Sequence, residues 1–206
     1  MLNAYIWDLD GTLLDSYGSI VSSLAEVARN SGAADGEDEI LQSVKRGAVS
    51  AYLRDLSGRS GRAYDELYDE YRRISHDRME EITLIPEARE TLSALQAAGC
   101  RHFVYTHRGP STNALLTRLG LKDFFTEIVT FENGFRPKPS GEGAAYLVRK
   151  YRLNPAETAY VGDRALDVFC GRDAGIRAIL YRPKDSCVDP TGREDLVIEN
   201  LRELEQ

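Results

Sequence analysis

The sequence predicts an α/β fold in which a parallel sheet is interrupted by an all-helical insertion. Short apolar runs alternate with helical patterns over most of the chain, and near-continuous apolarity is typical of parallel strands buried on both faces. The alternation stops between residues 16 and 81, where only helical spacing is found. Polar side chains follow several of the apolar runs, at the edge of the sheet where open α/β folds bind their ligands.

Five apolar runs predict strands, and four helical patterns lie among them. The strands are 3–9, 101–106, 125–130, 158–162 and 176–181. The first helix begins with Pro86 in its first turn, places Ala88, Leu92 and Leu95 on one face, and ends at Gly99. The other helices are 113–119, 142–151 and 165–174. This order predicts a Rossmann-like sheet with helices on both faces.

The insertion between the first strand and the rest consists of several helices. Apolar side chains recur at helical spacing, and four glycines mark breaks between the segments: Ile20, Leu24 and Val27, then Tyr64, Leu67 and Tyr71, with Gly32, Gly36, Gly58 and Gly61. We therefore divide the chain into a Rossmann-like core, 1–15 and 82–206, and a helical insertion, 16–81.

Composition agrees with a compact soluble enzyme, which we expect to be cytoplasmic and either a monomer or a homodimer. Of the 206 residues 42% are hydrophobic, which suffices for a packed core. The net charge of −7 argues against nucleic acid or a membrane as partner, because both reward clustered Lys and Arg. No apolar stretch approaches the roughly 18 to 20 residues of a membrane span. Cys100, Cys170 and Cys187 lie far apart, which indicates neither a disulfide framework nor a zinc site.

Two carboxylates end the first predicted strand. In Asp8-Leu9-Asp10-Gly11-Thr12, the two acids start on the same side of the strand because side chains alternate, and Gly11 permits a sharp exit. One carboxylate there can attack phosphorus as a nucleophile. The other can protonate a leaving alkoxide and later deprotonate water.

Three further segments complete a set with Asp8 and Asp10. Thr106 follows the apolar run 103–105, Lys138 stands between two prolines, and Gly162-Asp163-Arg164-Ala165-Leu166-Asp167 begins a helical pattern. These motifs, in this order from Tyr5 to about Tyr181, resemble those of the haloacid dehalogenase superfamily of phosphotransferases. Its dehalogenase members lack the second carboxylate of the first motif, so Asp10 favours the phosphatase branch.

The resemblance implies a role for each motif. Asp8 is the nucleophile that carries an aspartyl-phosphate, and Asp10 is the general acid and base. Thr106 and Lys138 bind phosphoryl oxygens, with Lys138 bridging to the nucleophile. The resemblance implies that Mg²⁺ is bound by the carboxylate of Asp8, by Asp163 and by the backbone carbonyl of Asp10. Asp167 is implied in the second shell or in contact through water. Oxygen-only ligation suits this hard cation. The helical insertion is implied to be a cap over the active site.

The resemblance also implies a small phosphorylated metabolite as substrate, with a phosphoglycolate phosphatase as the nearest model. Substrate contacts are expected from Gly11 and Thr12 in the first turn, from His107, and from Arg46 in the insertion. A β-phosphoglucomutase-type phosphosugar mutase shares the motifs, although mutases tend to carry valine where Thr12 stands. A non-enzymatic phospho-acceptor module is a remoter alternative, because such modules lack both the insertion and the Gly-Asp-x-x-x-Asp segment.

Overall fold

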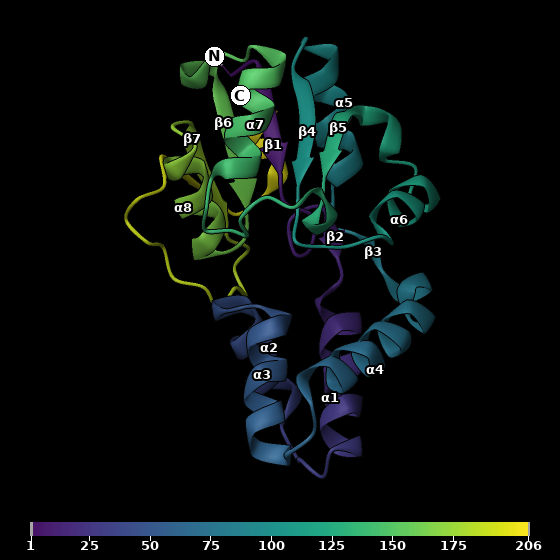
Figure 1. Ribbon diagram of the computed structural model, residues 1–206. Helices are drawn as coiled ribbons and strands as arrows, with labels where there is room; N and C mark the ends of the chain where they lie inside the picture. The colour runs from purple at the N-terminus through teal and green to yellow at the C-terminus, as the bar shows by residue number, and fades with distance from the viewer. Residues whose placement is uncertain (1, 206) are drawn as a thin grey trace. The chain divides into compact units, whose positions relative to one another are not determined.

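The computed structural model describes residues 2–205, and the chain divides into two compact units (Figure 1). One unit comprises the chain up to Leu14 and from Leu84 onward, and the other is Asp15–Thr83. The chain passes between them through two short strands, β2 (Leu14–Asp15) and β3 (Thr83–Leu84), which pair with each other. That the second unit acts as a cap stays a prediction.

In the part of the chain that the structure describes, six parallel strands form the sheet of the first unit. Their order is β5-β4-β1-β6-β7-β8. The strands are β1 (Ala4–Trp7), β4 (Arg101–Tyr105), β5 (Phe125–Val129), β6 (Thr158–Gly162), β7 (Arg177–Tyr181) and β8 (Leu196–Ile198). The central strands β1 and β6 pair in parallel and are buried at every position, which confirms the parallel sheet expected from their continuous apolarity.

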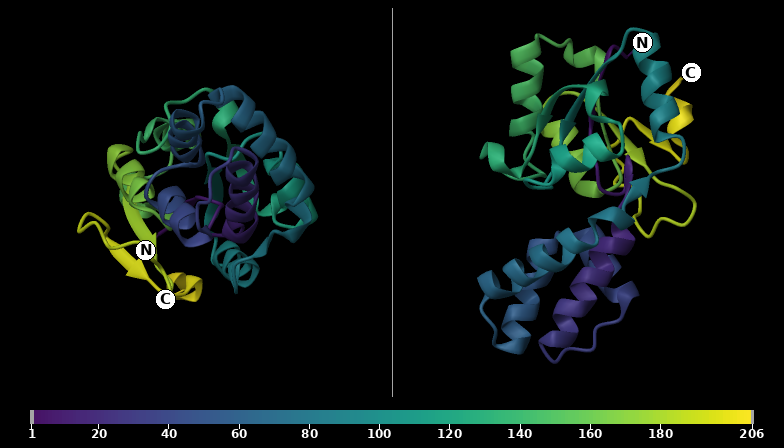
Figure 2. Two further views of the ribbon diagram at one scale, coloured as in Figure 1. Left: turned by 90° about the horizontal axis from the view of Figure 1, so that it is seen from below. Right: turned by 90° about the vertical axis from the view of Figure 1, so that its right-hand side faces the viewer.

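Helices cover both faces of this sheet (Figure 2). They are α5 (Ala88–Ala97), α6 (Thr112–Arg118), α7 (Glu142–Tyr151) and α8 (Ala165–Asp173). Ala144 and Leu147 of α7 and Cys170 of α8 pack with Ile6 and Phe103 in one buried cluster. Figure 2, right panel, shows α5 on the opposite face from α7. The four helices therefore hold the sheet between two apolar layers.

The second unit has its own hydrophobic core. Helices α1 (Tyr17–Asn30), α2 (Glu37–Arg46), α3 (Val49–Ser60) and α4 (Tyr64–Asp77) bury one cluster that includes Leu24, Val27, Ile40, Leu53 and Leu67. No helix within residues 2–205 is long and apolar enough to cross a membrane.

Two details of the core unit differ from the sequence prediction. Helix α5 begins at Ala88, not with Pro86 in its first turn, because Glu87 adopts a left-handed backbone with φ 66° in the preceding turn. Strand β8 was missed by the pattern, since its three residues follow Asp195 and precede Glu199 in a polar stretch. It pairs with β7 and ends the sheet.

Candidate active site

The acidic and hydroxyl side chains of the motifs gather at the carboxyl ends of three neighbouring strands. Asp8 follows β1, Thr106 follows β4 and Asp163 follows β6, and β1 lies between the other two. The Asp8 N–H donates to the Val161 carbonyl at 2.9 Å, so the hydrogen bonding between β1 and β6 continues as far as Asp8. All three side chains are buried. Parallel strands whose ends meet at one edge therefore build this site.

Lys138 links two of the carboxylates. Its Nζ lies 3.0 Å from Asp8 Oδ1 and 2.6 Å from Asp167 Oδ1, and both side chains of each pair are almost fully buried. The ammonium also lies 5.5 Å from the ring centroid of Tyr160, whose hydroxyl donates to the Tyr105 carbonyl at 2.6 Å. A cation in this place holds two acids side by side that would otherwise repel each other.

The charges of this cluster set its protonation. Burial alone would raise the pKa of Asp8, but Lys138 and Arg164 outweigh it and hold that pKa below its ordinary value. Burial would likewise lower the pKa of Lys138, but Asp167 and Asp8 raise it. Burial raises the pKa of Asp167. Asp8 is thus ionised, which is the state a nucleophilic carboxylate needs.

Asp167 owes its position to a glycine and a helix start. A Cβ on Gly162 would lie 2.3 Å from the Cβ of Asp167, so only glycine lets this side chain pack against the end of β6. Asp167 Oδ2 accepts the Arg164 backbone N–H at 3.1 Å and so caps α8, while its Oδ1 holds Lys138. One carboxylate fixes both the helix and the lysine.

Two arginines to which the motifs assign no role also lie here. Arg164 Nη2 is 3.5 Å from Asp8 Oδ2, and Arg108 makes a two-point pair with Asp10, with Nη2 to Oδ1 at 2.6 Å and Nε to Oδ2 at 3.3 Å. The Arg108 backbone N–H donates to Thr106 Oγ1 at 3.1 Å. Their positions inside the motif segments were the available signal, but the direction of a long side chain is not readable from sequence.

His107 supports the loop that carries Lys138. Its Nε2 accepts the Lys138 backbone N–H at 2.7 Å. Burial and the nearby Lys138 lower the pKa of His107 to about 3, so the ring is neutral near pH 7 and can accept. The Tyr105 hydroxyl donates to the Arg136 carbonyl at 2.9 Å in the same loop. His107 is therefore a positioning residue here, while its contact with substrate stays a prediction.

We expect His107→Ala to lower kcat about tenfold or more, because a small displacement of a charged group in an active site can cost up to about 10²-fold. Steady-state kinetics would measure the effect. His107→Gln offers an amide oxygen as acceptor and should recover part of the loss, with KM little changed. Equal kcat in His107→Ala and the wild type would contradict the positioning role.

The acidic side chains fit a divalent cation. Carboxylate oxygens of Asp8, Asp163 and Asp167 all lie within 4.8 Å of one another, and all three residues are buried. An oxygen-only donor set of this kind is what Mg²⁺ prefers. Both oxygens of Asp167 are already hydrogen-bonded, Oδ1 to Lys138 and Oδ2 to the backbone at the start of α8. Asp8 and Asp163 are therefore the better candidates for direct ligands.

The remaining predicted residues lie in two different places. Gly11 has φ 80° in the turn after β1, and Thr12 in the same turn is fully buried. Within residues 2–205, Thr12 Oγ1 has no hydrogen-bond partner. Arg46 is an exposed residue at the end of α2, in the second unit. A role of Arg46 in substrate binding therefore stays a prediction.

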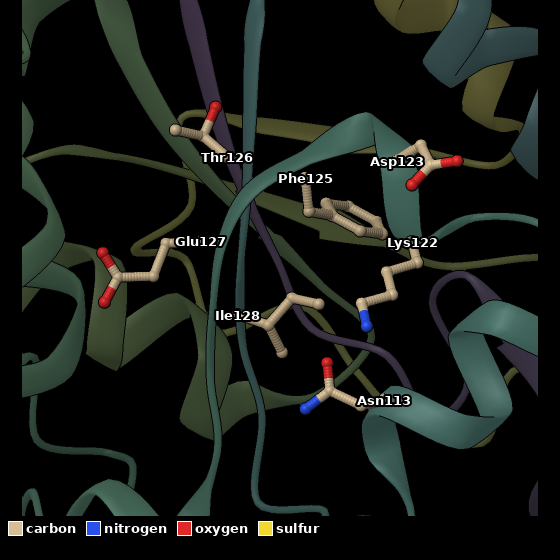
Figure 3. Close-up of a pocket in the computed structure, with 7 residues that line it drawn as sticks. All are labelled: Asn113, Lys122, Asp123, Phe125, Thr126, Glu127 and Ile128. Carbon is tan, nitrogen blue, oxygen red and sulfur yellow. The ribbon is translucent and has the colours of Figure 1, made fainter.

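A shallow hollow lies elsewhere on the first unit, beside the edge strand β5 (Figure 3). It is lined by Asn113, Lys122, Asp123, Phe125, Thr126, Glu127 and Ile128. None of the predicted site residues is among them, and Glu127 is paired with Lys150 at 2.7 Å. We assign this hollow no part in the chemistry.

Known proteins resemble this chain in sequence and in fold. The family model "Haloacid dehalogenase-like hydrolase" matches residues 5–181. The chain is 30% identical to a phosphoglycolate phosphatase of Rhodobacter capsulatus, over 88% of this chain and 84% of that protein. It is 29% identical to the pyrophosphatase PpaX of Bacillus velezensis, over 98% and 94%.

Among solved structures, one described as a haloacid dehalogenase-like hydrolase from Bacteroides fragilis superposes with a TM-score of 0.86 at 21% identity. The match covers 99% of this chain and all of that one, and it confirms the α/β fold. The motif residues meet at one sheet edge, and the family model spans most of the chain. The protein therefore belongs to the haloacid dehalogenase-like hydrolase family, as an enzyme of the phosphoric monoester hydrolase class.

Proposed function

We propose that this protein is a magnesium-dependent phosphatase that hydrolyses a small phosphorylated metabolite, in the manner of a phosphoglycolate phosphatase. The observation that supports this most strongly is the buried, ionised Asp8, with Lys138 at 3.0 Å and a group of acidic oxygens beside it. A nucleophile needs such cations nearby, because a phosphate dianion that approaches a carboxylate is otherwise repelled.

The reaction proceeds in two displacements. An oxygen of Asp8 attacks phosphorus, the bond from phosphorus to the alcohol oxygen breaks, and Asp10 gives its proton to the leaving alkoxide. Water then attacks the aspartyl-phosphate and passes a proton to Asp10. The bond between Asp8 and phosphorus breaks, which regenerates the carboxylate and releases inorganic phosphate.

The other side chains position and stabilise the transferring phosphoryl group. Lys138 and the hydroxyl of Thr106 face the developing negative charge. Asp8, Asp163 and the backbone carbonyl of Asp10 would hold the magnesium ion, with Asp167 in the second shell, and the ion would supply Lewis-acid stabilisation of the phosphoryl oxygens when bound. Arg108 fixes the carboxylate of Asp10 by its two-point contact.

We expect Asp10→Ala to slow phosphate release by at least about 10²-fold, a typical contribution of general acid–base catalysis. Release of inorganic phosphate from p-nitrophenyl phosphate and from an alkyl ester would be compared. The rate of phosphate release should fall further with the alkyl ester than with p-nitrophenyl phosphate, because an alkoxide leaves poorly without a proton. An equal fall in rate with both substrates would contradict the assignment of Asp10 as the general acid.

The substrate is best sought among small anionic esters. Relatives are named phosphoglycolate phosphatase and pyrophosphatase PpaX, and the chain's net charge of −7 supports a small-molecule partner in the cytoplasm over nucleic acid or a membrane. We further propose that the helical unit, Asp15–Thr83, selects the substrate through residues such as Arg46.

A phosphate-release screen tests these proposals. It would compare phosphoglycolate, pyrophosphate, p-nitrophenyl phosphate and β-glucose 1-phosphate, each with magnesium and with EDTA. We expect magnesium-dependent release, fastest from phosphoglycolate or a comparable small ester. Activity that is unchanged in EDTA would overturn the proposed magnesium dependence. Conversion of β-glucose 1-phosphate to glucose 6-phosphate with a bisphosphate primer, much faster than any hydrolysis, would show a mutase.

A further inference from the structure

Arg164 lies among the three carboxylates that fit a metal. Its Nη2 is 3.5 Å from Asp8 Oδ2, and its Nε is 4.0 Å from both Asp163 Oδ1 and Asp167 Oδ2. The side chain is 8% exposed. One guanidinium thus reaches every member of the acidic group, while the reaction scheme gives it no step.

Arg164 and Lys138 face different oxygens. Lys138 contacts Oδ1 of Asp8 and Oδ1 of Asp167, whereas Arg164 faces Oδ2 of both. When all three carboxylates are ionised, they face two cations, and one net negative charge remains. Arg164 therefore places its charge near the carboxylate oxygens that Lys138 does not contact, including Oδ1 of Asp163 at 4.0 Å.

Arg164 is shared among the three acids. It lies 3.5 Å from Asp8 and 4.0 Å from both Asp163 and Asp167, whereas charge-assisted hydrogen bonds are about 2.7–2.9 Å long. Arg108, by contrast, pairs with Asp10 at 2.6 Å. At these distances from the three carboxylates, the guanidinium can give way to a more strongly attracted cation.

We propose that Arg164 is the counter-ion that holds Asp8, Asp163 and Asp167 together in the metal-free protein, and that its charge weakens the binding of a divalent cation to the same carboxylates. The inference rests on the proposed magnesium site. It makes Arg164 a positioning residue that sets metal affinity: the carboxylates are pre-arranged without metal, and the metal must compete with a resident charge.

Metal affinity, measured without any assay of activity, tests the proposal. Magnesium would be titrated calorimetrically into the full chain for the wild type, Arg164→Met, Arg164→Lys and Arg172→Met. Arg172 is a control on the same helix, α8, where it pairs with Asp195 at 3.1 Å on the surface. We expect Arg164→Met to bind magnesium at least about tenfold more tightly, because like charges a few ångströms apart repel strongly at a buried site. Arg164→Lys and Arg172→Met should stay within about twofold of the wild type.

Thermal melting gives a second readout. Without metal, Arg164→Met should melt below the wild type, since three buried acids lose a cation, and magnesium should raise its melting temperature more than that of the wild type. Arg164→Gln, which keeps a hydrogen-bonding group at the start of α8, replaces Arg164→Met should the latter not fold.

The outcomes separate this inference from the proposed function. If all variants bind magnesium with one Kd, the counter-ion role is overturned while the metal site stands. A raised KM for substrate with unchanged magnesium affinity would make Arg164 a substrate ligand and likewise overturn it. If neither the wild type nor Arg164→Met binds magnesium, the proposed metal dependence fails, and this inference fails with it.

Discussion

We expect Asp8→Asn to abolish phosphate release, with kcat reduced by at least about 10⁴-fold, the scale on which removal of a nucleophile acts in other hydrolases. The amide has nearly the same shape as the carboxylate but is uncharged and a poor nucleophile. It would also give Lys138 no charged partner at Oδ1, where the ammonium now lies at 3.0 Å. Both effects act on the chemical step.

Phosphate release and acid-stable labelling by a phosphorylated substrate would measure this loss. Asp55→Asn makes the same chemical change on the surface of α3, where the carboxylate is 65% exposed, and should keep full activity. Far-ultraviolet circular dichroism of both variants would show that the fold persists. A tenth of the wild-type kcat in Asp8→Asn, with an intact fold, would contradict the nucleophile assignment.

Much of this site was predictable because strand ends carry a strong sequence signal. The run before Asp8 is apolar, the run before Asp163 is apolar after Thr158, and every residue of β1 and β6 is buried. Parallel strands end at the same edge of a sheet, so the acids that follow β1 and β6 meet there. Lys138, from a loop, was predictable only through the family resemblance.

What the sequence could not reveal is where long side chains point. Arg108 and Arg164 each stand within a motif, yet nothing in their spacing says that one reaches Asp10 and the other Asp8. Their directions are set by the backbone after β4 and β6 and by the carboxylates they face. Strand β8 could not be predicted for another reason: its three residues are too few to show the two-residue alternation of a strand.

His107 shows how a residue can belong to a site without belonging to the reaction. Its place after Thr106 indicated the active site, but the partner of its ring is the backbone of Lys138, which lies 31 residues further along the chain. Such a contact depends on the path of a loop between β5 and α7. Sequence patterns describe the strand and the helix but not this path.

Removal of Lys138 should have the second-largest effect, because it harms both stability and catalysis. We expect Lys138→Met to lower kcat by at least about 10³-fold, as one oxyanion-stabilising group can contribute about 10²–10³ and this one also orients the nucleophile. The free energy of unfolding should fall by about 3–5 kcal/mol, because two buried carboxylates lose the cation between them. Urea unfolding at neutral pH and steady-state kinetics would measure the two losses. Lys150→Met is the control, since that ammonium pairs with Glu127 on the surface and its loss should change stability little.

A second substitution separates the two effects. In Lys138→Met with Asp167→Asn, one of the two facing acids becomes neutral, so the remaining charge on Asp8 no longer repels it. We expect this double variant to regain part of the lost unfolding free energy but none of the lost kcat, because the phosphoryl group still lacks its cation. If kcat returned together with stability, Lys138 would act only by holding Asp167 in place. The lysine would then be a structural residue, and the charge of the transferring phosphate would have to be met by Arg164, the metal and backbone N–H groups alone.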